Sequence, residues 1–505
     1  MRRAAALLLA SVACNETGST AIPGLVTVSL AAPWKASTCA GPSNGGAFSP
    51  DAEVEPSVSA DPRDPRHLVG IWQQDRWSNG GANGLVTAAS FDGGHTWTQA
   101  TAKLTRCSGG LYDRASDPWV SIGPDGLVWQ IGFAFDATVP NRAMLVSRSD
   151  DGGKNWGAPV AVQQDTDPTV VMDKETLTAD PLDGNYVYAV WDRLTGANLP
   201  NNPQGTGPTW FARTTDRGAT WEPARNIYDP GADAQTISNQ IVVLPDGTLV
   251  NLMEVITQNS TAHPASSVAV LRSADRGATW QLPPVTVAQA FFVGVVDPKS
   301  GRGIRSGSVV PSIAVDRAGG ALYIAWEDAR FSAGARDGIA LSRSTDGGLS
   351  WSPPAQVNSA APGAQAYTPS LAVADGGVLG VSYYDLRNDD PRDLSNLLAT
   401  HWLAVSTDGG NTFSEAAVGT PFNTRLAPLV DGPAYFLGDY EGLAHAGTAL
   451  LPFFSAVPEA GVANIYFRPA DAAPAAAGPL RMAVQGVQQM WKGARERWRF
   501  GTLFK

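Results

Sequence analysis

One eight-residue pattern, Ser/Thr-x-Asp-x-Gly-x-Thr-Trp, recurs six times in this 505-residue chain and constrains its fold more than any other feature. The copies are Ser90–Trp97, Ser149–Trp156 (Asn155 at the Thr position), Thr214–Trp221, Ser273–Trp280, Ser344–Trp351 (Ser350 at the Thr position) and, with a closing Phe, Ser406–Phe413. Each copy has the chemistry of a turn, because the Asp carboxylate accepts backbone N–H groups and Gly adopts a positive φ without steric cost. Consecutive Asp positions are 59, 65, 59, 71 and 62 residues apart, which suits one four-stranded sheet with its loops. Repeated sheets of this size predict an all-β fold, a β-propeller.

Apolar, β-rich runs stand upstream of the repeated turns and agree with this prediction. Runs such as Tyr186–Trp191 and Leu322–Trp326 end in an aromatic residue that a charged residue follows. Several runs come directly after an Asp-Gly turn, as at Asp125-Gly126. Each repeat therefore predicts an inner strand, an Asp-Gly turn, a second strand, a long loop, a third strand, the repeated turn and an outer strand.

A seventh, incomplete unit follows the sixth repeat. Residues 436–443, 448–454 and 463–467 are predicted as its first three strands, and no repeated turn comes after them. The run 24–30 is the candidate for its outer strand, since propellers commonly close with a strand from the other end of the chain. Closure removes exposed sheet edges. We predict seven blades, with six as the alternative if the last unit only completes the first.

The composition agrees with a strand-rich chain and argues against one class of partner. Gly (53) and Pro (37) are frequent, and 16% of residues are charged, where about 25% is usual. The net charge is −11, and the basic residues of the repeats are scattered singly. Nucleic acid is therefore not an expected partner.

The N-terminal segment, residues 1–14, has the composition of a targeting signal. Arg2 and Arg3 precede a short apolar stretch that ends at Cys14, and about ten apolar residues are too few to span a bilayer. The segment resembles a bacterial lipoprotein signal, in which that Cys becomes lipidated, and an ordinary export signal is the alternative. The prediction is an exported protein, either a lipoprotein of the cell envelope or a secreted or periplasmic protein.

The remaining chain is predicted to have four parts. These are an N-terminal arm (15–50), the propeller (51–468), an Ala/Pro linker (469–480) and a basic amphipathic tail (481–505). Membrane contact is expected only through lipidated Cys14 and the tail. A disulfide between Cys39 and Cys107 would tie the arm to the first blade in an oxidising compartment, and two unrelated thiols are the alternative.

The number and spacing of the repeated turns resemble the Asp boxes of the sialidase (neuraminidase) superfamily, also described as BNR-repeat propellers, over about residues 50–468. In that family the boxes lie between the third and fourth strands, on the face away from the active site. The resemblance therefore implies a structural role for the six box aspartates. It also implies that any chemistry lies on the opposite face, where the inner strands begin and the second strands end.

Charged residues recur at those positions, and three interpretations compete for them. Asp and Arg two residues apart, as in Asp328/Arg330 and Asp385/Arg387, would pair and staple neighbouring blades. An acidic inner ring would hold a calcium ion, although no calcium-loop spacing supports this; its members would be Glu55, Asp117, Glu175 and Asp439. Glycoside hydrolysis is the third interpretation.

The resemblance to sialidases implies the parts that such hydrolysis needs. Arginines hold the sugar carboxylate, a Tyr activated by a Glu attacks the sugar, and an Asp supplies and accepts the proton. By repeat position, the catalytic candidates are Asp75, Glu254 and Tyr440, and the substrate-binding candidates are Arg76, Arg193, Arg330 and Arg387. The Arg-Ile-Pro signature of the family is absent, so Arg76 or Arg193 would have to replace its first arginine.

Two classes of function are compatible with these residues. The first is an exported glycoside hydrolase of the exo-α-sialidase type that acts on terminal sugars of glycans. The second is a non-catalytic surface propeller that binds glycan or protein through the same mouth. A monomer without cofactor is expected in either case.

Overall fold

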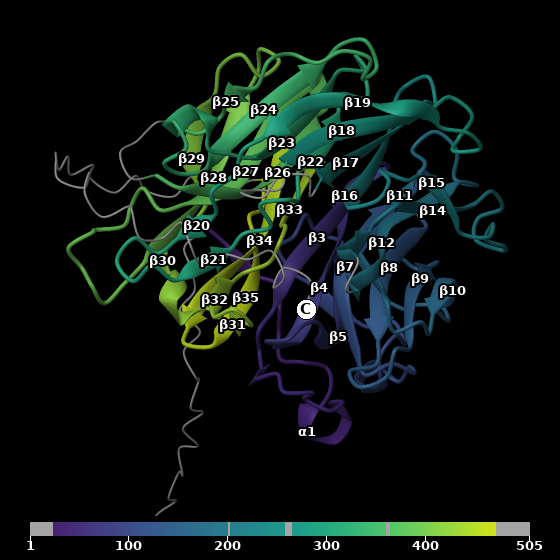
Figure 1. The fold of residues 1–505 in the computed structure, drawn as a ribbon, viewed down its shortest axis with the longest axis horizontal. Helices are drawn as coiled ribbons and strands as arrows, with labels where there is room; N and C mark the ends of the chain where they lie inside the picture. The colour runs from purple at the N-terminus through teal and green to yellow at the C-terminus, as the bar shows by residue number, and fades with distance from the viewer. Residues whose placement is uncertain (1–23, 200–201, 258–264, 360–363, 471–505) are drawn as a thin grey trace, which may run out of the picture.

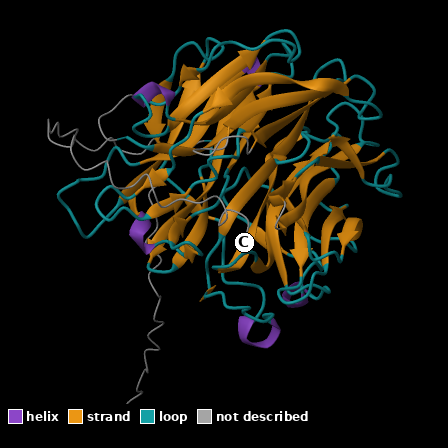
Figure 2. Ribbon diagram, in the orientation of Figure 1, coloured by secondary structure: helices purple, strands orange, loops and turns teal. Residues whose placement is uncertain are grey.

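Each repeat of the sequence forms one antiparallel sheet, and seven such sheets surround a common axis (Figure 1). The computed structural model describes residues 24–199, 202–257, 265–359 and 364–470. Strands dominate this part of the chain (Figure 2). Its helical elements are α1 (Ala36–Cys39) and the 3₁₀ turns η1 (Arg106–Ser108), η2 (Arg330–Ser332), η3 (Asp375–Gly377) and η4 (Thr424–Leu426). The predicted all-β propeller is confirmed.

Blades 1 to 6 each contain four strands in chain order from the axis outward. Blade 1 contains β3 (Val54–Asp61), β4 (Asp64–Trp77), β5 (Ala82–Ser90) and β6 (Thr98–Ala100), and blade 2 contains β7 (Arg114–Ile122), β8 (Val128–Phe135), β9 (Arg142–Ser149) and β10 (Val160–Asp165). Blade 3 contains β11 (Val170–Ala179), β12 (Val187–Leu199), β14 (Thr209–Thr214) and β15 (Arg225–Tyr228), and blade 4 contains β16 (Ala234–Val243), β17 (Leu249–Thr257), β18 (Ala265–Ser273) and β19 (Gln281–Ala290). Blade 5 contains β22 (Ser312–Val315), β23 (Leu322–Asp328), β24 (Gly338–Ser344) and β25 (Ala355–Gln356), and blade 6 contains β26 (Ala366–Ala374), β27 (Val378–Asp385), β28 (Leu398–Ser406) and β29 (Ser414–Ala417). Three short strands extend the blades: β2 (Phe48–Ser49) beside β4, β13 (Asn202–Thr206) beside β12, and β30 (Phe422–Asn423) beside β28.

Blade 7 joins the two ends of the described chain. It contains β33 (Gly442–Ala446), β34 (Ala449–Glu459), β35 (Val462–Phe467) and, as its outer strand, β1 (Val26–Thr27). β1 runs antiparallel to β35, with Val26 opposite Phe467, and it lies within the run 24–30 predicted as the donor. The first strand starts later than the predicted 436, because residues 437–441 turn toward the axis. Seven blades, not six, close the ring.

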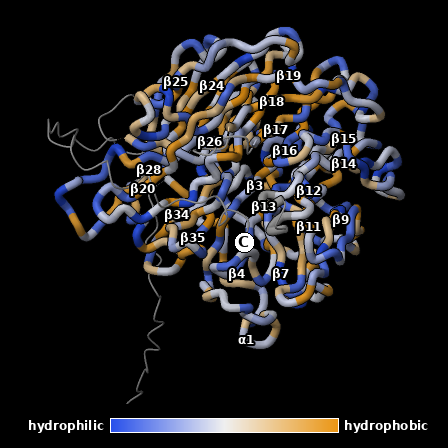
Figure 3. Tube along the Cα trace, in the orientation of Figure 1, coloured by the Kyte–Doolittle hydropathy of each residue, from blue (hydrophilic) through white to orange (hydrophobic). Residues whose placement is uncertain are grey.

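The blades pack through apolar faces and through repeated polar ties between inner strands. A Trp of the second strand is fully buried in blades 1, 3 and 5 (Trp72, Trp191 and Trp326), and the apolar stretches follow the strands (Figure 3). The Ser121 hydroxyl accepts a hydrogen bond from the backbone N–H of Ala179 in the next blade (3.0 Å). Ser312 does the same for Leu371 (3.1 Å). These ties satisfy backbone groups that would otherwise lack a partner between sheets.

The Asp boxes form the turns between third and fourth strands, as the family resemblance implied. In the first box, the Asp92 carboxylate accepts hydrogen bonds from the backbone N–H (3.0 Å) and hydroxyl (2.6 Å) of Thr96. Ser90 donates its hydroxyl to the same carboxylate (2.8 Å) and accepts the N–H of Gly94 (2.8 Å). Slight burial raises the pKa of Asp92, but these hydrogen bonds outweigh it and lower the pKa to about 2. The box carboxylates are thus fully used in holding turns.

A small additional sheet covers part of the face opposite the boxes. It contains β20 (Val295–Val296), β21 (Gly303–Arg305), β32 (Ala434–Phe436) and β31 (Leu429–Val430). Its strands come from two insertions, before blade 5 and before blade 7, and β21 pairs with β32 in parallel. Asp431 fastens this sheet to blade 1, because its backbone N–H donates to the Ser78 carbonyl (2.9 Å) and its carboxylate accepts the Ser78 hydroxyl (2.8 Å). No repeat signature predicts this sheet.

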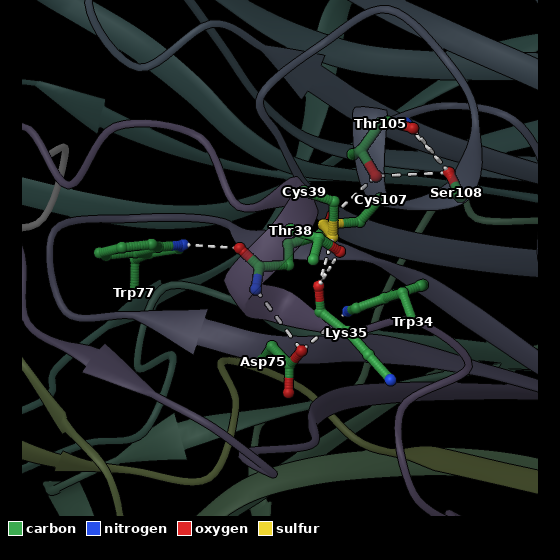
Figure 4. Close-up of a disulfide and its surroundings, with 10 residues drawn as sticks. Trp34, Lys35, Thr38, Cys39, Asp75, Trp77, Thr105, Cys107 and Ser108 are labelled. Atoms are coloured by element: carbon green, nitrogen blue, oxygen red, sulfur yellow. Dashed lines mark hydrogen bonds between the residues drawn. A yellow bond between two sulfur atoms is a disulfide. The ribbon is translucent and has the colours of Figure 1, made fainter.

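The N-terminal arm crosses blades 1 and 2 on the same face. Cys39 and Cys107 are joined by a disulfide between α1 and η1 (Figure 4). Nearby, the Trp34 indole N–H donates to the Asp75 carboxylate (2.8 Å), and Arg114 donates to the carbonyls of Pro42 and Ser43 (both 2.9 Å). The predicted signal (1–14) and tail (481–505) lie outside the described residues. No helix within the described ranges is long and apolar enough to cross a membrane.

Loss of this disulfide should destabilise the protein measurably. The two cysteines are separated by 68 residues, and closing a loop of that size stabilises a fold by about 2–4 kcal/mol. We expect the double variant Cys39→Ser/Cys107→Ser to lose stability of this order in guanidinium unfolding at one pH. The wild type under dithiothreitol should match the variant, and the variant should not respond to the reductant. Equal stability of oxidised and reduced wild type would contradict the expectation.

Candidate functional site

A central channel lies between the inner strands, with a cavity volume of about 80 Å³. Every blade contributes to its wall. One lining residue from each, in blade order, is Ser57, Trp119, Glu175, Gln240, Ser312, Ser370 and Glu441. The channel is therefore the place where residues far apart in the sequence meet.

Each inner strand enters the channel through an equivalent four-residue segment. In blades 1, 2, 5 and 6 the second residue is Pro and the fourth is aliphatic, as in Thr368-Pro369-Ser370-Leu371. In five blades the first residue of this segment adopts a positive φ of 50–62°, and the register of strand pairing shifts there. These residues are Glu55, Asp117, Lys174, Ser238 and Thr368. Such a backbone costs about 1–3 kcal/mol for a residue other than glycine, and it is typical of functional sites.

Blades 3 and 7 break this pattern, because Glu175 and Glu441 stand where four other blades have Pro. Both side chains are buried, at 2% and 3% exposure, and both line the channel. Among the described residues, neither carboxylate oxygen of Glu175 has a hydrogen-bond partner. Glu441 Oε1 accepts the Ser382 hydroxyl (2.9 Å) and lies 2.7 Å from His401 Nε2, whereas its Oε2 has no partner in the described part of the chain. Unpaired buried carboxylate oxygens are expensive, so this pair points to a bound ligand.

A buried ion network surrounds Glu175. The Lys174 ammonium contacts Asp117 (2.6 Å), Asp173 (3.1 Å) and Asp439 (3.1 Å). Burial alone would lower the pKa of Lys174, but Asp117 and the other carboxylates raise it well above its usual value. Arg305 of β21 donates hydrogen bonds from two guanidinium nitrogens to the carboxylate of Asp439. Burial opposes ionisation of Asp439, yet Arg305 and Lys174 outweigh it and hold its pKa well below the usual range.

Titration properties differ sharply between carboxylates of this network. Burial, followed by the charge of Asp117, raises the pKa of Glu175 well above its usual value. Burial also raises the pKa of Glu55 to about 8. Glu175 is therefore expected to hold a proton before a ligand binds, while Asp439 stays ionised. Neighbouring carboxylates with separated pKa values are a common arrangement for acid–base chemistry.

One aromatic ring, that of Phe436, contacts both Arg76 and Arg305. The guanidinium carbons of Arg76 and Arg305 lie 4.9 and 5.2 Å from the ring centre of Phe436. Arg76 donates to the Gln73 side-chain oxygen (2.6 Å), and Gln73 donates to Glu55. Among the predicted substrate-binding arginines, Arg76 is the one that joins this central network.

The other three predicted arginines are held by carboxylates in their own neighbourhood. Arg193 donates two hydrogen bonds to Asp165 (2.8 and 2.7 Å). Arg330 grips Asp328 (2.8 and 2.7 Å). Arg387 pairs with Asp385 and, on the outer strand β29, with Glu415. A carboxylate fits the planar guanidinium group well, so each of these arginines is bound by a carboxylate near it. The structure therefore does not bring the three guanidinium groups together. The interpretation in which such arginines pair with nearby carboxylates describes them.

The predicted catalytic residues lie at separate places. Tyr440 lines the channel, but its hydroxyl donates to the Pro118 carbonyl (3.0 Å), and burial and Glu55 raise its pKa well above the usual value. Glu254 is fully buried and hydrogen-bonded to Ser266, and burial raises its pKa to about 8. The Asp75 carboxylate fastens the arm through Trp34. No hydrogen bond between described residues links Glu254 to Tyr440.

Comparison with known proteins finds similar solved structures at low identity. No protein-family model matches this chain, and no curated protein matches its sequence. Similar solved structures include the Hadza microbial sialidase Hz136, with 16% identity over 80% of this chain and 72% of its own, at a TM-score of 0.46. Another is an α-L-arabinofuranosidase of Fusarium graminearum in complex with an iminosugar inhibitor, with 16% identity, 72% and 92% coverage and a TM-score of 0.47. A third is an α-L-arabinanase of Penicillium chrysogenum complexed with arabinobiose, with 12% identity, 88% and 98% coverage and a TM-score of 0.45.

The fold is a seven-bladed β-propeller, as its own sheet topology shows. At these identities and TM-scores the similar structures assign no chemistry, so the chemistry of this propeller depends on its own channel. Within the described ranges, no three His, Cys, Asp or Glu side chains are grouped as a metal site requires. Lys174 and Arg305 are cations that its acidic ring contacts directly.

Sequence reasoning missed Lys174, Arg305 and Glu441. A signal existed for Glu441, because aligning the x-Pro-x-aliphatic segments of four blades puts Tyr440-Glu441-Gly442-Leu443 and Lys174-Glu175-Thr176-Leu177 in register. Two glutamates at a position that holds Pro in four blades and Asn239 in blade 4 would then have stood out. Arg305 had no such signal, since it comes from an insertion without a repeat.

Proposed function

We propose that this chain is a glycoside hydrolase that acts on terminal sugars of glycans, with Glu175 and Glu441 as its catalytic groups. One observation carries the proposal: two buried carboxylates from blades 3 and 7 line the same channel, and each has an oxygen without a hydrogen-bond partner among the described residues. Glycoside hydrolysis needs a pair of carboxyl groups on either side of the bond that breaks.

The two environments favour different roles. Burial and the nearby charge of Asp117 raise the pKa of Glu175 and so favour its neutral form, which suits the acid that protonates the leaving oxygen. Glu441 is fixed through one oxygen by Ser382 and His401. Its other oxygen suits attack on the sugar, or activation of a water molecule.

The exo-α-sialidase type is the specific form that the sequence predicted, and it now has less support. Sialic acid carries a carboxylate, and tight binding of that carboxylate requires several guanidinium groups that point to the same place. Arg193, Arg330 and Arg387 are engaged elsewhere. A sugar without a carboxylate is therefore the better candidate.

Non-catalytic binding is the second candidate, and a separate observation favours it. The Tyr440 hydroxyl is occupied by a backbone carbonyl, and Glu254 by a serine, so a tyrosine nucleophile with its activating Glu is not assembled. We further propose that the protein acts outside the cytoplasm, which the Cys39–Cys107 disulfide supports. Lipidation at Cys14, membrane contact through the tail and the monomeric state stay predictions.

A panel of 4-methylumbelliferyl glycosides that includes an α-sialoside tests the proposal. Turnover of at least one by the wild type is expected, and inertness against the whole panel would contradict hydrolysis. The Tyr440→Phe variant should retain kcat/KM within about tenfold, because only one hydrogen bond to a carbonyl is lost. A loss above about 10³-fold on the sialoside would instead support a tyrosine nucleophile.

A further inference from the structure

The network at the channel contains more carboxylates than cations. Its carboxylates are Glu55, Asp117, Asp173, Glu175, Asp192 and Asp439, and its cations are Arg76, Lys174 and Arg305. Lys174 and Arg305 are already engaged by Asp117, Asp173 and Asp439. A buried set of this kind favours either protons or a cation from outside.

Two polar groups between blades 3 and 4 lack partners in this network. Within the described ranges, Asp192 Oδ1 and the Ser238 hydroxyl have no hydrogen-bond partner, although their residues are only 4% and 5% exposed. They are neighbours, because Asp192 of β12 and Ser238 of β16 lie on strands that contact each other and Ser238 acts on the Asp192 carboxyl group. Ser238 lines the channel together with Glu175. Ser238 therefore lies at the channel wall with the proposed catalytic acid, and Asp192 lies next to Ser238.

An ammonium group satisfies both atoms better than the alternatives. It carries three donors and a positive charge, so it bonds a carboxylate oxygen and a hydroxyl oxygen at once. A neutral hydroxyl has one donor and leaves the excess of negative charge uncompensated. A metal ion is not favoured, because no group of three ligating side chains exists among the described residues.

We propose that the channel binds a sugar bearing a free amino group, whose ammonium contacts Asp192 and Ser238. This rests on the proposed function, and it names the substrate class as unacetylated amino sugars. An N-acetylated sugar lacks the charge and two of the donors, so the site discriminates against it.

Binding of such a sugar should release protons. Asp192 is faced by Asp173 and Lys174 of β11, by Asp117 of β7 and by Ser238 of β16. Burial, followed by Asp173, raises the pKa of Asp192 well above its usual value, which favours a proton on this group before the sugar binds. The ammonium takes the place of that proton when it binds.

Isothermal titration calorimetry in two buffers of different ionisation enthalpy tests the inference. The probes are the methyl glycosides of glucosamine and galactosamine, each beside its N-acetyl and its neutral sugar counterpart. We expect one amino glycoside to bind at least about tenfold more tightly than both counterparts, with proton release. The Asp192→Asn variant should lose the preference, and Glu222→Gln, outside the channel next to the third Asp box, should keep it.

Each outcome decides between the two claims. Equal binding of amino and neutral glycosides, no binding of any, or a preference that survives Asp192→Asn would overturn the amine site. If the wild type hydrolyses neutral glycosides and shows no amine preference, the proposed function stands and this inference fails. If amino glycosides bind selectively but the matching 4-methylumbelliferyl amino glycosides are not turned over, the amine site stands and hydrolysis fails.

Discussion

Replacing Glu175 with Gln is expected to lower kcat/KM by about 10²–10⁴-fold on whichever glycoside the wild type hydrolyses best, because Gln keeps the shape but cannot donate the proton. The pH profile supplies a second readout. An acid works only while protonated, so wild-type activity should fall as pH rises through the raised pKa of Glu175. In the variant this alkaline fall should disappear. Steady-state kinetics between about pH 5 and 9 measures both effects.

Two further variants make the result specific. Glu222→Gln changes a carboxylate that pairs with Arg213 and Arg225 outside the channel, and its kinetics should match the wild type. Glu254→Gln separates the two mechanisms, because Glu254 is the residue that the sialidase resemblance selects. If Glu254→Gln abolishes turnover while Glu175→Gln does not, the catalytic assignment made from the channel is wrong.

Lys174→Met should cost about 3–5 kcal/mol of unfolding free energy at pH 8, since removing one partner of a buried ion pair leaves uncompensated charge. Three carboxylates contact this ammonium: Asp117, Asp173 and Asp439. Without it they become easier to protonate, so their repulsion is relieved in acid. The loss at pH 5 should therefore be smaller than at pH 8. Guanidinium unfolding at both pH values measures the difference.

A surface pair provides the matched comparison for this prediction. Arg392 and Asp390 also form an ion pair, but their side chains are 82% and 47% exposed. Arg392→Met should leave the unfolding free energy close to that of the wild type, because water screens an exposed ion pair. A Lys174→Met protein as stable as Arg392→Met would show that the central network is not a stabilising element.

The fold was predictable because its signal is local. Each Asp box is a turn whose hydrogen bonds join residues two to four positions apart, such as Ser90, Asp92 and Thr96, so the sequence pattern and the structure coincide. The seventh blade was predictable for a related reason, since three strands without an outer partner imply a donor elsewhere. Its first strand was placed too early, because residues 437–441 carry Asp439 and Tyr440 into the channel instead of pairing.

The site was predictable in position but not in detail. The sequence pattern puts Glu175, Asp117 and Asp439 at the starts of inner strands; in the structure Asp117 and Glu175 lie within β7 and β11, and Asp439 lies in the segment before β33. It did not reveal that Arg330 and Arg387 turn to the nearest carboxylate, because that choice depends on rotamers and neighbouring loops. It also did not point to Arg305, since only the parallel pairing of β21 with β32 brings that insertion to Asp439.

Closure of blade 7 by β1 has a consequence for biogenesis. β35 stays an open edge until Val26 and Thr27 pair with it, and those residues are made more than four hundred positions earlier. A growing chain must keep its first strand unengaged while six blades assemble, and an unpaired edge invites association between chains. The final step of folding, in which β1 pairs with β35, should therefore be the slowest step and the one most prone to aggregation.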